Sequence, residues 1–182
     1  MNTLITRYNN MVDWVMPKVD GWLLPTLARF TFGATLVAYF WASALTKLGD
    51  GVFGFLSPSM GAYVQIFPKA MEAAGYDPAN LGTMHWLVVT AGTWAEFLLP
   101  ALIVLGLFTR LASLGMLGFI LVQSLTDLFG HGALQHAQTL GAWFDRTPDS
   151  LILDQRLFWV TVLAILVVRG AGPVSLDRVF RR

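Results

Sequence analysis

The stretch that decides the fold is "VVTAGTWAEFLLPALIVLGLFTR", from Val88 to Arg110. Between Trp86 and Thr109 the only side chain that can carry a charge near neutral pH is Glu96. A helix needs about 20 mainly apolar residues to cross the hydrocarbon core of a bilayer. This stretch therefore predicts a transmembrane helix with a single acid inside it.

The composition of the whole chain is typical of a membrane protein. Of its 182 residues, 55% are hydrophobic and 13% are charged, whereas roughly one quarter of the residues in soluble domains are charged. Three further stretches approach the length of a span, which predicts an all-α fold, an integral membrane four-helix bundle with helical outer loops. We expect one domain over 22–182, with spans at about 25–46, 83–108, 111–129 and 156–169.

The first 21 residues carry apolar side chains at the spacing of one helical face. A cleavable signal peptide has an unbroken apolar core, but Asn9, Asn10 and Asp13 interrupt this segment. We therefore expect residues 1–21 to be retained as an amphipathic helix on the cytoplasmic surface of the bilayer.

Basic residues in the connections predict the orientation, because Lys and Arg stay preferentially on the cytoplasmic side. With the N-terminus inside, seven basic residues are cytoplasmic and four are outside. The seven are Arg7, Lys18, Arg110, Arg169, Arg178, Arg181 and Arg182. Both termini are therefore expected in the cytoplasm, with the long loops 47–82 and 129–156 outside.

Two classes of function are excluded by charge and composition. A net charge of +1 with scattered basic residues does not provide a nucleic-acid surface. The chain has no cysteine, which removes thiol–disulfide chemistry and thiolate metal sites.

Glu96 needs an explanation because an ionised, unpaired carboxylate is costly inside a bilayer. It lies 11 residues from Leu107, so its depth is roughly 16 Å from the inner surface. We expect Arg29 to pair with it and regard Lys47, at the opposite end of the first span, as the second choice. Polar residues at similar depth complete a candidate ligand or quinone pocket: Thr35, Tyr39, Gln123 and Thr161. Helix association, ligand contact and a proton path all remain open as roles for this layer.

The second outer loop offers candidates of two kinds. Its histidines, His131 and His136, are five residues apart, which does not place two ligands on one helix face, and we expect no metal there. The loop also carries much apolar surface, which either packs as a lid on the first outer loop or docks an extracytoplasmic partner. The docking candidates have the composition of an interface centre: Trp143, Phe144 and Arg146.

Three segments, together with the apolar third span, carry a family resemblance. They are "ARFTFGATLVAYFWASALTKL", "AEFLLPALIVLGLFTRLASLGML" and "RGAGPVSLD". Together they resemble the DoxX family of small four-helix membrane proteins, over about residues 25–178. The motif residues are Gly106, Thr109, Arg110, Gly172, Pro173, Ser175 and Asp177.

The resemblance implies a multi-pass protein of a bacterial-type plasma membrane. Some relatives are membrane subunits of quinone-reducing sulfur oxidation or of other oxidoreductase complexes. We therefore expect a subunit that anchors or supports a redox partner, has no independent catalysis, and offers a quinone-sized pocket around Arg29, Glu96 and Gln123. The alternative is a non-redox scaffold or small-molecule carrier associated with a secreted or periplasmic partner. Either protein could form homo-oligomers, and the long outer loops depart from the compact members of the family.

Overall fold

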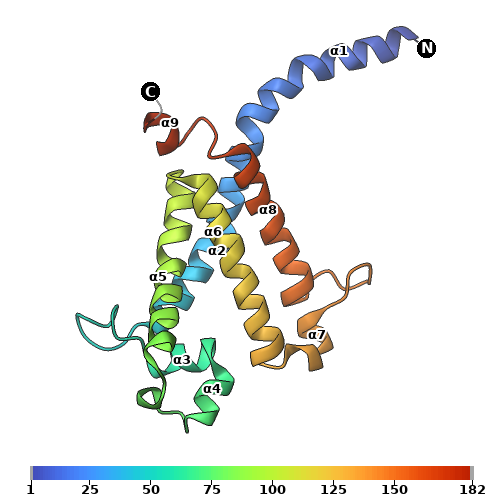
Figure 1. Cartoon of the computed structure of the whole chain (residues 1–182). Coiled ribbons are helices and arrows are strands. Elements are labelled where there is room, and N and C mark those ends of the chain that lie inside the picture. Colours follow the sequence, from blue (N-terminus) through green and yellow to red (C-terminus); the bar gives the residue numbers. More distant parts are fainter. Residues whose placement is uncertain (1, 181–182) are drawn as a thin grey trace.

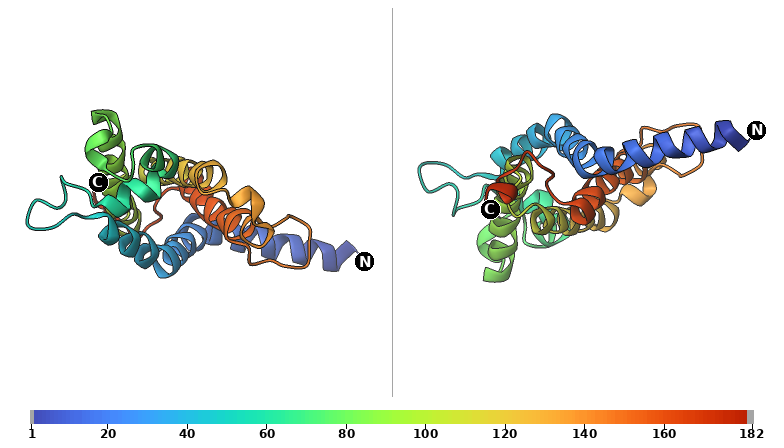
Figure 2. Two further views of the ribbon diagram at one scale, coloured as in Figure 1. Left: turned by 90° about the horizontal axis from the view of Figure 1, so that it is seen from below. Right: turned by 90° about the horizontal axis from the view of Figure 1, so that it is seen from above.

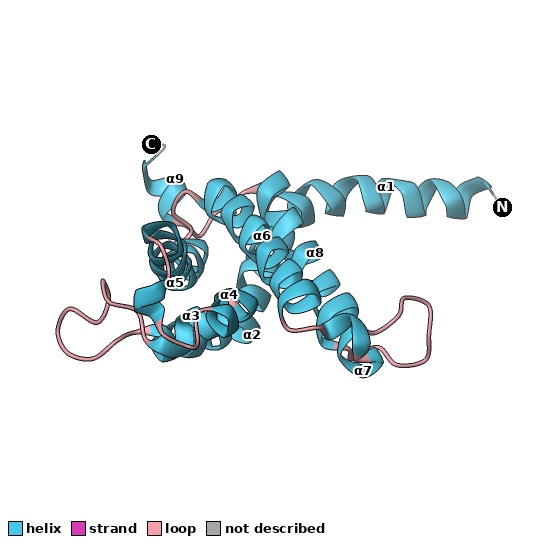
Figure 3. Cartoon of the chain, turned by 60° about the horizontal axis from the view of Figure 1, so that its bottom comes forward, coloured by secondary structure: helices cyan, strands magenta, loops and turns pink. Residues whose placement is uncertain are grey.

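The computed structural model describes residues 2–180, and a bundle of four long helices forms its body (Figure 1). These helices are α2 (Leu24–Lys47), α5 (Thr83–Leu105), α6 (Thr109–Leu125) and α8 (Arg156–Arg169). The other α-helices are α1 (Asn2–Lys18), α3 (Met60–Ile66), α4 (Pro68–Ala73), α7 (Ala137–Leu140) and α9 (Leu176–Phe180). Residues 2–180 contain no β-strand (Figure 3).

Four helical segments in the described part of the chain are long and apolar enough to cross a membrane. They are Thr3–Lys47, Thr83–Leu105, Thr109–Gly130 and Leu151–Arg169. The predicted fold class, an all-α membrane protein, is therefore confirmed.

Two predicted span boundaries were wrong, and local backbone geometry explains both. The second span ends at Leu105, not at 108, because Gly106 adopts a left-handed conformation with φ +68° that stops the helix. The fourth span begins at Leu151, not at 156, because a π-helical turn, Leu151–Gln155, runs directly into α8. The fourth span is therefore 19 residues long, close to the length of a full crossing.

The bundle has two different ends. The start of α2 and the short helix α9 lie at one end, called here the terminal end, so both described termini are on that side (Figure 1). The connections that contain α3, α4 and α7 lie at the other end, called here the loop end (Figure 1). Arg181 and Arg182, which contribute to the predicted orientation, lie outside the described residues.

Helix α1 projects from the terminal end, away from the bundle (Figures 1 and 2). A π-helical turn, Val19–Leu23, joins it to α2, so that helical backbone is continuous between them. Its apolar side chains are exposed, among them Leu4, Tyr8 and Trp14. An exposed apolar face on a helix outside the bundle fits the predicted interfacial position.

Apolar packing holds the four long helices together. The core contains side chains with no exposed surface from α2, α5, α6 and α8, including Phe32, Ile103, Met116 and Leu163. A second, smaller core at the loop end joins α3 and α4 to α5 through Ala62, Met71 and Val89. The two cores leave a polar region between them, and the candidate site lies there.

Candidate functional site

A cavity of about 80 Å³ lies inside the loop end of the bundle. Residues of α2, α3, α5 and α6 and of the turn after α6 line it, so each of the first three spans contributes to its wall. Its polar lining is Ser43, Lys47, Gln65, Glu96, Gln123 and Asp127. A volume of this size holds about two or three water molecules, each of which occupies about 30 Å³.

Glu96 is paired with Lys47. The Lys47 ammonium donates to both carboxylate oxygens of Glu96, at 2.8 Å to Oε1 and 2.7 Å to Oε2. It also donates to the Ser43 hydroxyl at 2.7 Å, and that hydroxyl donates to Glu96 Oε1 at 3.2 Å. The two charged side chains are only 5% and 4% exposed. All three hydrogens of the Lys47 ammonium group therefore donate to Glu96 or Ser43.

The predicted pairing of Glu96 with Arg29 was wrong. Arg29 lies near the start of α2, beside the last turn of α5, and within residues 2–180 its guanidinium donates only to backbone carbonyls. The acceptors are Ile103 at 3.2 Å, Val104 at 2.6 Å, Ala171 at 2.9 Å, and Val174. Carbonyls at a helix C-terminus have no intrahelical partner. The free carbonyls at the end of α5 therefore accept hydrogen bonds from Arg29, and they lie nearer to the terminal end of the bundle than Glu96 does. Arg29 consequently joins α2 to α5 and to the segment that follows α8.

A second ion pair, with a buried arginine and a partly exposed aspartate, borders the same region. Arg156, at the start of α8, pairs with Asp127, and its Nη1 donates to the Ser124 hydroxyl at 2.8 Å. The arginine is 4% exposed, and its Nε has no hydrogen-bond partner among the described residues. This pair was not predicted, because the sequence places Arg156 at the edge of a span with no indication of the distant acid that faces it.

The remaining members of the predicted polar layer separate into two groups. Gln123 donates to the Tyr39 hydroxyl at 3.1 Å, which joins α6 to α2. Its other amide atom, Oε1, is buried without a hydrogen-bond partner among residues 2–180. Thr35 and Thr161 were wrongly included: both are exposed and donate to their own helices, to the carbonyls of Thr31 and Leu157. A threonine hydroxyl can bond to the carbonyl one turn earlier, so its polarity alone does not identify an inward face.

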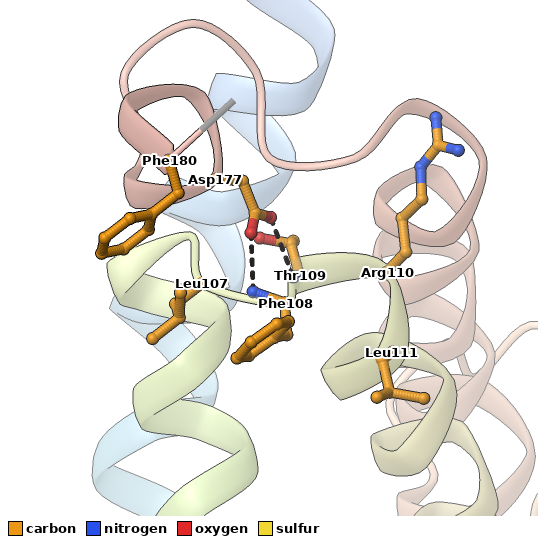
Figure 4. A pocket seen from close by; sticks show the side chains of 7 residues that line it. All are labelled: Leu107, Phe108, Thr109, Arg110, Leu111, Asp177 and Phe180. Carbon is orange, nitrogen blue, oxygen red and sulfur yellow. Dashed lines mark hydrogen bonds between the residues drawn. The ribbon is translucent and has the colours of Figure 1, made fainter. Parts of the chain in front are cut away.

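The motif residues meet at the terminal end, far from the cavity. The Asp177 carboxylate accepts from the backbone amides of Phe108 at 2.7 Å and Thr109 at 3.0 Å (Figure 4). These are the first amides of α6, so a residue distant in sequence caps this helix. The Asp177 amide in turn donates to Gly106 O at 2.7 Å. The Gly-Leu-Phe-Thr-Arg and Gly-Pro-Val-Ser-Leu-Asp motifs thus hold the C-terminal segment on the α5–α6 turn.

Glycine is required at position 106 for two reasons. Its φ of +68° is unfavourable for other residues, and a Cβ there would lie 2.6 Å from Ser175 Cβ and 3.0 Å from Arg29 Cζ. The closeness of Gly106 to Ser175 also shows that the two motifs pack directly against each other.

The connection between α6 and α8, the second of the two long loops, is only partly covered. His131 Nε2 lies 2.9 Å from the carbonyl oxygen of Gln65, so the start of the loop contacts α3. The Trp143 indole donates to Leu153 O at 3.1 Å, whereas Phe144 is fully exposed with φ +66° and Arg146 is exposed. Within residues 2–180 no three His, Asp or Glu side chains gather in a way that could hold a metal ion, and His136 is exposed.

Comparison with known families finds a match. The profile of the DoxX family matches residues 24–131, more than half of the chain. The match includes α2, α5 and α6, and therefore Lys47, Glu96 and Gln123, but it ends before the Trp143 loop and the C-terminal motif. Neither the curated proteins nor the solved structures include a significant match.

Proposed function

Since the chain belongs to the DoxX family, we propose that it is a plasma-membrane subunit that anchors or supports a redox partner and performs no chemistry of its own. The family resemblance is the reason for a redox partner. In this proposal both termini are cytoplasmic, as the distribution of Lys and Arg predicts, so the loop end faces outward and receives the partner. The observation that carries the proposal is the exposed aromatic surface at that end.

This surface is formed by residues that the described chain leaves uncovered. In the first outer loop Val52 and Phe53 are 87% and 72% exposed. In the second, Trp143 is 55% exposed and Phe144 extends fully from the protein. Phe144 also has a left-handed backbone, which is costly for a bulky residue. A large aromatic side chain kept outside the bundle in a strained conformation suits an anchor that inserts into a partner.

The interior supports a subunit without independent turnover. Lys47 and Glu96 satisfy each other at 2.7 Å, and Arg156 is paired with Asp127. A buried pair of this kind holds neither a free base nor a free acid. The first pair joins α2 to α5, and the second joins α8 to the turn at the end of α6, so both stabilise the packing of the helices.

A quinone does not fit the polar cavity. The cavity measures about 80 Å³, whereas pockets for ring-sized ligands measure about 300–1,000 Å³. Arg29, expected as a headgroup contact, lies beside the last turn of α5 and bonds to backbone carbonyls. No step of the proposed function therefore passes through a quinone at this site.

Site-specific photocrosslinking in the native membrane tests the proposal. A photoreactive residue at position 144 should crosslink to a protein with an extracytoplasmic domain that contains a haem, flavin or iron–sulfur centre. The same residue at position 30 is the matched control, because Phe30 is a phenylalanine on α2 that is 70% exposed. A position-144 product without a redox centre, or the same product from position 30, would contradict the proposal.

The second candidate function is a carrier for a small neutral solute, and one observation favours it. Gln123 lines the cavity of about 80 Å³, and its Oε1 is a buried acceptor without a hydrogen-bond partner among residues 2–180. An unsatisfied acceptor is costly, and a small hydrogen-bond donor such as water or urea would satisfy it. Stopped-flow light scattering of proteoliposomes tests this candidate. Urea entry should exceed that of protein-free vesicles and should fall in Gln123→Leu, and equal rates for the three preparations would exclude it.

A further inference from the structure

A groove with arginine side chains lies at the terminal end, outside the polar cavity described above. It has a volume of about 280 Å³ and lies between the end of α8, the loop that follows it, the start of α6 and α9. Its cationic lining consists of Arg110, Arg169 and Arg178, and Gly170 and Gly172 form part of its wall. A Cβ at position 170 would lie 3.3 Å from Arg110 Nε, so the absence of a side chain there makes room for this guanidinium.

The carboxylates near the groove are already engaged. Asp20 pairs with Arg169 at 2.7 Å. Asp177 accepts from the first amides of α6, those of Phe108 and Thr109. Both acids therefore have partners other than Arg110 and Arg178.

Two of the three arginines make no ion pair within residues 2–180, and together they exceed by one the single negative charge of the Asp177 carboxylate that also lines the groove. Arg110 is exposed and donates to a neutral acceptor, Val168 O, at 3.1 Å. Arg178 is also exposed, and its guanidinium makes no ion pair within residues 2–180. The groove thus presents two guanidinium groups that are not in ion pairs, beside a chain segment that has little side-chain bulk.

An apolar groove of about 600 Å³ adjoins the cationic one and shares Arg110 and Asp177 with it (Figure 4). Its apolar lining is Leu107, Phe108, Leu111 and Phe180. Phe108, Leu111 and Phe180 are 64%, 70% and 74% exposed. A cationic groove beside an exposed apolar one at the end of a transmembrane bundle matches the two parts of a phospholipid.

We propose that this double groove binds one anionic phospholipid of the phosphatidylglycerol class. The phosphate accepts hydrogen bonds from Arg110 and Arg178, because guanidinium groups fit phosphate oxygens well. An acyl chain lies along Phe108 and Leu111. A zwitterionic lipid binds less well, because the positive charge of its own headgroup opposes the two arginines.

Native mass spectrometry of the delipidated full-length protein in detergent tests this site. Phosphatidylglycerol should bind more tightly than phosphatidylcholine with the same acyl chains. Arg178→Gln should weaken phosphatidylglycerol binding about fivefold, and the double variant with Arg110→Gln about 25-fold, as expected for loss of arginines near an anionic surface. Arg146→Gln, an exposed arginine at the loop end, is the matched control and should leave binding unchanged.

The Arg178→Gln variant should fold like the wild type, because the Arg178 side chain makes no ion pair within residues 2–180 that the substitution would break. Equal binding of the two lipids, or undiminished phosphatidylglycerol binding by Arg178→Gln, would overturn the proposal. Inorganic phosphate serves as the competitor without acyl chains. Displacement of the lipid by low millimolar phosphate would show a simple anion site and would also overturn it.

Discussion

Removal of Glu96 should be one of the most damaging single substitutions in the interior. Glu96→Ala leaves Lys47, which is about 95% buried, with the Ser43 hydroxyl and no anion. Breaking a buried pair by removing one partner costs about 3–5 kcal/mol. Lys47→Met should cost a similar amount, because it leaves the Glu96 carboxylate without its cation in the same enclosed position.

Replacement of both partners should be much milder than either single change. In Lys47→Met with Glu96→Leu no charge remains to be desolvated, and apolar side chains of similar volume occupy the space. Such a replacement is often neutral or stabilising by about 1–4 kcal/mol. The two single changes sum to about 6–10 kcal/mol, so the expected coupling amounts to several kcal/mol.

Reversible unfolding in mixed micelles of dodecylmaltoside and SDS, followed by far-UV circular dichroism, measures these free energies. A double-mutant cycle on Arg29 and Glu96 is the internal control. Arg29 bonds to carbonyls at positions 103 and 104, seven residues or about 10 Å along α5 from Glu96, so these two changes should add within about 0.5 kcal/mol. A Lys47–Glu96 cycle that is additive, or an Arg29–Glu96 cycle that is not, would refute the assignment of the pair.

Three further predictions concern the terminal end and the orientation. Gly106→Ala should destabilise the protein by at least about 1 kcal/mol, because alanine is strained at φ +68° and meets Ser175; a melting temperature equal to that of the wild type would contradict this. Asp177→Ala should cost about 0.5–2 kcal/mol through loss of the cap on α6, and limited proteolysis should then cleave the C-terminal segment faster, whereas an unchanged cleavage rate would count against the capping role. In intact cells an impermeant thiol reagent should label Phe144→Cys and not Val179→Cys, since the two positions lie at opposite ends of the bundle; the reverse pattern would invert the proposed orientation.

The sequence predicted the membrane architecture because transfer of apolar side chains into a bilayer is a local property that sums along a segment. It also identified Glu96 as an acid that must find a partner inside the protein. The motifs around Gly106 and Asp177 were recognisable together, although nothing in the sequence alone indicates that one supplies the helix cap of the other. The exposed Trp143 and Phe144 were predicted as one of two alternatives, and the structure leaves Phe144 uncovered.

The partners of the charged residues could be decided only by the tertiary structure. Sequence fixes the position of a residue along its own helix, but not the direction in which the helix presents it or the register of its neighbours. Lys47 and Ser43 lie one turn apart on the face of α2 that meets Glu96, while Arg29 bonds to the free carbonyls at the end of α5. Arg156 and Asp127 meet across 29 residues of sequence. Such long-range pairings depend on how the helices cross, because a buried charge binds whichever opposite charge or carbonyl the packing brings within about 3 Å.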